Sequence, residues 1–95
     1  MINMNETEQP PARVEATRRE PRYSVNKDVQ VTVEGATVPA TLVDQSLHGF
    51  RIRIAPGCVR PRQVITLHYA WGDVQATVVW TRNEEKYSEA GLLVP

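Results

Sequence analysis

The stretch Val29-Gln30-Val31-Thr32-Val33-Glu34-Gly35 decides the fold. Valine takes every second position and polar residues take the positions between, which is the period of a strand with one buried face. Glu34-Gly35 then predicts a tight turn, because glycine reaches backbone angles that other residues avoid. The stretch therefore predicts a β-strand from about Lys27 that ends in a hairpin.

The rest of the chain repeats this pattern of short strands separated by turn residues. Phe50, Ile52 and Ile54 alternate with two arginines, so one face of that segment is apolar and the other is basic. Pro39 cannot donate to a strand ladder, so we expect it at a sheet edge or a bulge. No segment has a convincing helical period. The further expected strands are residues 37–44, 50–54, 63–69, 74–82 and 90–94.

About six short strands with regular turn signals are typical of a sandwich or a barrel. Exposed strand edges invite aggregation, and a small chain avoids them best by closing its sheet. We therefore predict an all-β fold, a small six-stranded antiparallel β-barrel with Greek-key features.

Length and composition limit the classes of protein to consider. The 95 residues allow one small domain. Eleven Lys and Arg balance eleven Asp and Glu, so no overall field attracts long nucleic acid, and any anion site has to be local. A single cysteine, Cys58, allows no internal disulfide, and no apolar run is long enough to cross a bilayer. Because nothing resembles a signal peptide, we expect a cytoplasmic protein.

The first part of the chain differs in composition from the rest. Residues 1–17 are rich in Asn, Glu, Gln and Pro, and Pro10-Pro11 interrupts any regular structure there. We expect a flexible N-terminal tail over residues 1–17. A barrel domain over residues 18–95 follows, and it includes an arginine-rich lead-in.

Three arginines, Arg18, Arg19 and Arg22, fall within five positions around Pro21. Their guanidinium groups repel one another and cannot be deprotonated to relieve the repulsion. An anion with planar acceptors would offset it, because the arginine fork pairs with phosphate oxygens and with the guanine edge and stacks on base planes. The cluster therefore points to a nucleotide.

The loop Asp44-Gln45-Ser46-Leu47-His48-Gly49 offers a second set of polar groups. In one interpretation it is only a turn, in which Asp44 and Ser46 bond nearby backbone amides and Gly49 takes a positive φ. In the other, the Asp44 carboxylate accepts the two parallel hydrogen bonds that the N1–H and N2–H₂ groups of guanine offer. Together with the arginines, the loop predicts a guanine-and-phosphate site.

The order Arg18-x-x-x-Arg22, a valine-rich strand pair, then Asp44-x-Ser46-x-x-Gly49 resembles the PilZ domain, a six-stranded bacterial barrel that binds cyclic di-GMP. Residues 78–82 and 91–94 are similar to the closing strands of that family. The resemblance covers roughly residues 18–94, which is nearly the whole chain outside the expected tail. It implies a cyclic di-GMP receptor, with no enzymatic activity and no cofactor.

The resemblance also assigns roles to the motif residues. Arg18 and Arg22 would bind the guanine edge and the phosphates, with Arg19 between them as a further contact. Asp44 would hold a guanine, Ser46 would bond a phosphate or a base, and Gly49 would let the backbone approach. The family often has glycine at the position of His48, so a side chain there narrows the loop or adds a ring near the ligand.

The expected partners are cyclic di-GMP and a downstream protein, and relatives act in motility, exopolysaccharide synthesis or transcription. The ligand would bridge the two motifs and order the N-terminal segment. The alternative is a PilZ-like protein-interaction module that works without the ligand. A single-strand nucleic-acid binder would need aromatic residues interleaved on a basic face, and here they are scattered.

Several further residues have a plain structural interpretation beside a functional one. Arg51 and Arg53 are expected on a solvated basic face, with contact to ligand phosphate as the alternative. Trp80 is expected in the core or at the barrel rim, with ligand contact as the alternative. The two histidines and the cysteine lack the paired spacing of a zinc site, so no metal is expected.

Overall fold

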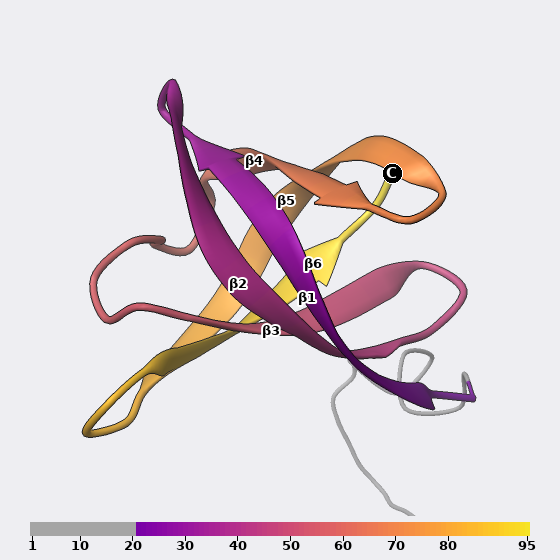
Figure 1. The fold of residues 1–95 in the computed structure, drawn as a ribbon, viewed down its shortest axis with the longest axis horizontal. Coiled ribbons are helices and arrows are strands. Elements are labelled where there is room, and N and C mark those ends of the chain that lie inside the picture. Colours follow the sequence, from indigo (N-terminus) through magenta and orange to yellow (C-terminus); the bar gives the residue numbers. More distant parts are fainter. Residues whose placement is uncertain (1–20) are drawn as a thin grey trace, which may run out of the picture.

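The computed structural model describes residues 21–95, which form six antiparallel strands in a closed barrel (Figure 1). The predicted all-β class and the six-stranded barrel are confirmed. Residues 21–95 contain no helix that could span a membrane. The strands are β1 (Tyr23–Val33), β2 (Ala36–Gln45), β3 (Gly49–Ile54), β4 (Val64–Tyr69), β5 (Gly72–Asn83) and β6 (Ser88–Leu93).

Around the barrel the strands follow the order β1-β2-β3-β6-β5-β4, and β4 pairs with β1 to close it. Strand β4 thus returns beside β1 of the β1-β2-β3 meander, which is the Greek-key arrangement that the strand pattern predicted. The closing β1–β4 ladder is short and runs from Gln30↔His68 to Thr32↔Thr66.

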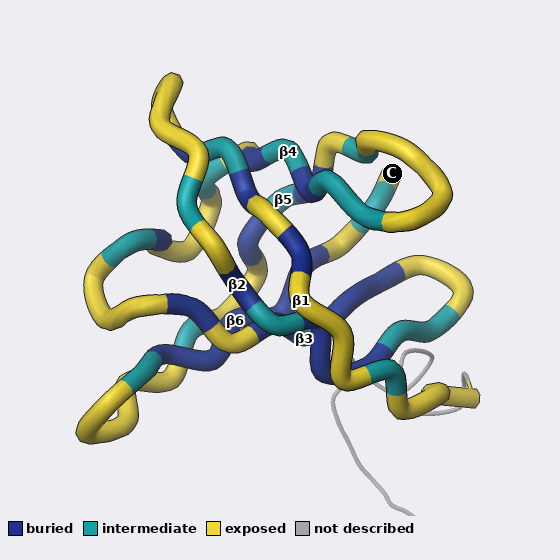
Figure 2. Tube along the Cα trace, viewed as in Figure 1, coloured by how far each residue is buried: buried dark blue, intermediate teal, exposed yellow. Residues whose placement is uncertain are grey.

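The core lies inside the barrel and is made by the alternating apolar residues of all six strands. Figure 2 shows buried segments where the strands cross and exposed segments at the hairpin tips. Alternate side chains of a strand point to opposite faces of the sheet, so the valines of β1 fill the interior and the residues between them face outward. The most buried side chains include Val31, Leu42, Ile52, Ile65, Leu67 and Val78.

The β1–β2 hairpin has the predicted tight turn. Glu34 and Gly35 both have positive φ, 50° and 84°. Positive φ at both central residues is the signature of the two-residue turn whose twist suits a hairpin. Pro39 lies one residue beyond the last β2–β3 pair, Ala40↔Ile54, so it sits where β2 has a free edge, as expected.

Strand β1 begins at Tyr23, four residues before the predicted start. Its first residues pair as Tyr23↔Gln45 and Ser24↔Asp44, and a register shift follows before Lys27. Asn26 has a φ of 55° within that irregularity, a conformation that asparagine tolerates better than most residues. Because this stretch does not alternate regularly, the sequence pattern did not indicate a strand before Lys27. The pairing of Ser24 with Asp44 brings the neighbouring Arg22 next to Asp44.

Candidate functional site

Arg22 joins the two predicted motifs directly. It precedes β1, and its guanidinium donates from Nε and Nη2 to Oδ1 of Asp44, at 3.0 and 2.7 Å. Its Nη1 donates to Oγ of Ser46 at 3.3 Å. The β1–β2 pairing near Ser24 positions both partners, so Arg22 is held on the barrel by the acid and the hydroxyl of the loop.

A second arginine approaches Asp44 from the opposite side. Nη2 of Arg51, on β3, lies 2.7 Å from Oδ2 of Asp44, and the aspartate side chain is only 9% exposed. A nearly buried carboxylate is costly unless it is paired and hydrogen-bonded. Here two guanidinium groups supply that pairing, one on each oxygen.

The site continues as a row of residues across the outer face of four strands. Asp44 pairs with Arg51, Arg51 with Gly91, and Gly91 with Trp80. The indole of Trp80 lies against Gly91, where even a Cβ atom would collide with the ring. Because Trp80 remains 40% exposed, it offers a partly open aromatic surface in the same row as the Arg22–Asp44 pair.

Two β-bulges place the ends of this row on the outer face. Register shifts fall between Leu42 and Asp44 in β2 and between Val78 and Trp80 in β5. Each inserts one valine, Val43 or Val79, and a bulge re-aims the side chain that follows it. If Val43 and Val79 instead took regular paired positions, strict alternation after the inward-facing Leu42 and Val78 would turn Asp44 and Trp80 inward.

A buried glutamate organises the adjacent outward row. Glu89 of β6 is 3% exposed and accepts from Nε of Arg53 at 3.1 Å and from Nη2 of Arg82 at 2.8 Å. Its Oε1 also lies 4.0 Å from Nη1 of Arg51. Arg53 in addition stacks over the ring of Tyr87 at 5.0 Å. Arg51 therefore lies between two carboxylates and joins this row to the first.

Gly49 corrects one expectation about the loop. In the interpretation of the loop as a plain turn it was expected to take a positive φ, but it is not among the positive-φ glycines of the described chain and instead begins β3 in the ladder. Its glycine identity has another cause: a Cβ atom there would lie 2.8 Å from the carbonyl oxygen of Leu92. Gly49 thus lets β3 approach β6 closely, and the Ser46 N–H closes the loop by donating to its carbonyl at 2.9 Å.

The predicted site residues are brought together only in part within the described chain. Arg22, Asp44 and Ser46 meet, and Gly49 closes their loop. Arg18 and Arg19 lie outside the described residues, as does the whole expected tail over residues 1–17. His48 is exposed at the loop tip, and its carbonyl accepts from Val94 N–H at 2.8 Å.

The sequence interpretation undervalued Arg51 and Trp80 and missed Glu89. Arg51 lies on a partly solvated face, with 38% of its side chain exposed, but it also pairs with the near-buried Asp44, and its Nε is buried without a hydrogen-bond partner. The sequence did carry one signal: the doublets Leu42-Val43 and Val78-Val79 break the strand alternation at the two bulges. In residues 21–95, no cluster of three or more His, Cys, Asp or Glu could hold a metal.

The described chain is thus a small closed six-stranded barrel whose Asp-x-Ser loop is held by an arginine from ahead of the first strand. Comparison with family models matches residues 16–93 to the PilZ domain, so the chain belongs to the PilZ family. That family comprises binding modules for cyclic di-GMP. A search among curated proteins finds no match to this chain.

Proposed function

We propose that this protein is a cyclic di-GMP receptor whose ligand binds where Arg22 meets Asp44 and Ser46. The convergence of these three side chains carries the proposal, because it unites an arginine fork, a carboxylate and a hydroxyl from separate parts of the chain. Arg18 and Arg19, which precede Arg22 by a few residues, would complete the site from the N-terminal side.

Binding requires the arginines and the ligand to exchange partners. Both oxygens of Asp44 are engaged by guanidinium groups, so a guanine edge has to displace at least one of them. The displaced arginine would be compensated by a ligand phosphate, since charge-assisted bidentate pairs are strong with phosphate as well as with carboxylate. Arg22 is the group that exchanges more readily, because it lies outside the strand ladder, whereas Arg51, whose side chain is equally exposed, is held within β3.

The row of residues from Asp44 to Trp80 would supply further contacts to the same ligand. The partly exposed indole of Trp80 offers a face on which a base can stack, and base–aromatic stacking contributes about 1–3 kcal/mol per base. Arg51 lies between Trp80 and Asp44 in the row and would face the sugar-phosphate ring.

The signal would be the repositioning of the segment that carries Arg22. Cyclic di-GMP would hold the arginines against the barrel in a new arrangement and order the residues before them, at an entropic cost that the new contacts have to exceed. The ligand shifts this equilibrium only by its differential affinity for the two arrangements. By analogy with relatives, the output would be motility, exopolysaccharide synthesis or transcription.

Titration calorimetry with cyclic di-GMP tests the proposal and distinguishes it from a ligand-independent interaction module. We expect the unaltered protein to bind at micromolar ligand and Arg22→Ala to lose binding by about tenfold or more, the value of a charge-assisted contact. Arg60→Ala is the matched control, because Arg60 is 73% exposed and pairs with Glu34 at the β1–β2 turn. The assignment would be refuted if the unaltered protein gave no heat of binding, or if Arg22→Ala and Arg60→Ala bound cyclic di-GMP with equal affinity.

A further inference from the structure

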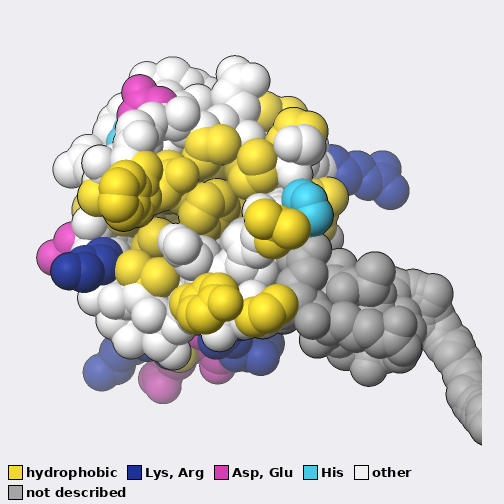
Figure 3. All heavy atoms as spheres, turned by 90° about the vertical axis from the view of Figure 1, so that its right-hand side faces the viewer, with side chains coloured by type: hydrophobic (Ala, Val, Ile, Leu, Met, Phe, Trp, Pro, Cys, Tyr) yellow, Lys and Arg dark blue, Asp and Glu magenta, His cyan; other side chains and the backbone are white. Residues whose placement is uncertain are grey.

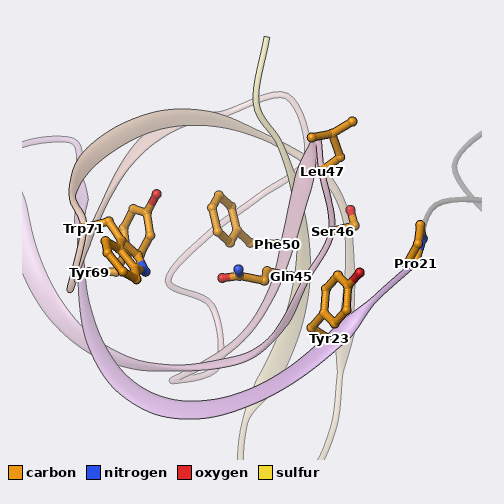
Figure 4. Close-up of a pocket in the computed structure, with 8 residues that line it drawn as sticks. All are labelled: Pro21, Tyr23, Gln45, Ser46, Leu47, Phe50, Tyr69 and Trp71. Atoms are coloured by element: carbon orange, nitrogen blue, oxygen red, sulfur yellow. The ribbon is translucent and has the colours of Figure 1, made fainter.

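A hollow lies at one end of the barrel, on the other side of the β2–β3 wall from the charged row. Its volume is about 430 Å³. In Figure 4, Tyr69 and Trp71 stand on one side, the loop and the start of β1 on the other, and Phe50 lies between them. Figure 3 shows hydrophobic side chains across the middle of this face, with charged ones at its margins. The hollow is lined by Pro21, Tyr23, Gln45, Ser46, Leu47, Phe50, Tyr69 and Trp71.

The lining carries no charge and exposes large apolar groups. All eight residues are uncharged, although charged residues make up 23% of the chain. Trp71 is 85% exposed, Leu47 79% and Tyr23 62%. At the base of the hollow the rings of Phe50 and Tyr69 meet edge to face, with centroids 5.4 Å apart. Aromatic residues around an uncharged depression are the composition of an interface core.

We propose that this hollow is the docking surface for an uncharged, apolar segment of another protein, anchored by one bulky aliphatic or aromatic side chain. A charged anchor would lose its hydration without gaining a countercharge from the lining. The volume suits one or two anchoring side chains, and the exposed Trp71 and Leu47 would close over them.

The hollow shares its walls with the proposed nucleotide site, which favours a separate protein that reads the signal as the occupant. Pro21 and Tyr23 line the hollow and flank Arg22, the arginine tied to Asp44. Ser46 lines the hollow and also accepts from Arg22. We therefore expect a ligand that draws Arg22 away to shift its neighbours Pro21 and Tyr23, and with them one side of the hollow. This coupling rests on the proposed function, whereas docking itself does not.

The docking claim can be tested without knowing the partner. The full chain would be used to select from a phage-displayed random peptide library, and the enriched peptide would be titrated by fluorescence anisotropy. We expect an uncharged peptide with an aromatic or leucine anchor, and about tenfold or more weaker binding to Trp71→Ala. Val64→Ala is the matched control, an apolar residue that is 59% exposed on β4 and outside the hollow. Circular dichroism would verify that both variants fold.

Other outcomes would overturn the docking proposal. These are enrichment of charged peptides, an equal loss of peptide affinity in Trp71→Ala and Val64→Ala, or no enriched peptide. A dimer detected by light scattering that Trp71→Ala dissociates would make a second copy the occupant. Nuclear Overhauser contacts between the Trp71 ring and residues 1–20 would make the chain its own occupant.

The coupling has a separate readout. Saturating cyclic di-GMP is expected to change the peptide affinity of the unaltered protein by about fivefold or more, a typical allosteric coupling. The same addition should leave the peptide affinity of Arg22→Ala unchanged. If the nucleotide fails to bind at all, the proposed function fails while peptide docking stands. If the nucleotide binds and the peptide affinity does not move, the coupling is wrong.

Discussion

At the scale of single residues, the outer face of the barrel depends on two buried carboxylates that hold several arginines in place. Asp44 fixes Arg22 and Arg51, and Glu89 fixes Arg53 and Arg82. The two carboxylates have different roles. Asp44 is paired with the exposed Arg22 and, in the proposed function, would exchange this arginine for the ligand, whereas Glu89 lies within the β3–β6–β5 ladder and holds its arginines in place.

The structural role of Glu89 predicts a loss of stability on neutralisation. Glu89→Gln removes the charge that its arginines share, and the free energy of unfolding should fall by about 2–3 kcal/mol. Glu84→Gln should change it by less than about 0.5 kcal/mol, because Glu84 also pairs with Arg82 at 2.8 Å but is 38% exposed. Urea denaturation of the two variants makes the comparison. Equal effects would show that burial of Glu89 contributes nothing.

The contact between Trp80 and Gly91 predicts a non-additive pair of substitutions. Gly91→Ala places a methyl group in the indole ring and should destabilise the fold by about 1–3 kcal/mol. In a Trp80→Ala background the same change should cost less than about 1 kcal/mol, because the obstructing ring is gone. A double-mutant cycle by urea denaturation measures the difference, and additive costs would contradict this packing.

At the scale of elements, the shortest ladder of the barrel is joined by one histidine. His68 of β4 lies 2.7 Å from Oγ1 of Thr32 on β1 and 2.8 Å from Oδ1 of Asp73 on β5. With the proton on Nδ1, the imidazole donates to Asp73 and accepts from Thr32. The side chain therefore ties three strands together where β1 and β4 share only a few residue pairs.

This arrangement predicts that His68→Ala weakens barrel closure. Two hydrogen bonds at a partly exposed position contribute about 1–2 kcal/mol together, so the free energy of unfolding of His68→Ala should be lower by that amount. Amide exchange of β1 residues 30–32 should rise more than that of β3 residues. Gln75→Ala, an exposed change on neighbouring β5, serves as the control and should stay within about 0.5 kcal/mol. Unchanged β1 exchange in His68→Ala would contradict the role of the histidine.

At the scale of the whole molecule, the alternation of apolar residues predicted the strands, and the need to avoid exposed strand edges then favoured a barrel over a sandwich. The valines of β1 and the Phe50-to-Ile54 alternation predicted buried faces that the structure confirms. Which strands become neighbours was not predictable from local period, because β3 and β6 are far apart in sequence. That pairing is what sets Glu89 among arginines and completes the row from Asp44 to Trp80.

The candidate site was predictable where it depended on motif chemistry and unpredictable where it depended on register. Asp44, Ser46 and Arg22 could be singled out by residue type and spacing, and the structure brings them into contact. The outward placement of Trp80 depends on a one-residue bulge at Val79, and a slip of one residue reverses the face of every side chain beyond it. The pattern of apolar and polar residues within a short strand does not specify where such a bulge falls.

Cyclic di-GMP binding, as proposed, requires Arg22 to leave Asp44. The most direct measurement follows the arginine Nε–Hε resonances by NMR while cyclic di-GMP is added to the full chain. We predict that the Arg22 resonance shifts most, because its Nε donates to Asp44 at 3.0 Å, while Arg53, bonded to Glu89, shifts little. An Arg22 resonance that stays in place at saturating cyclic di-GMP would contradict the account.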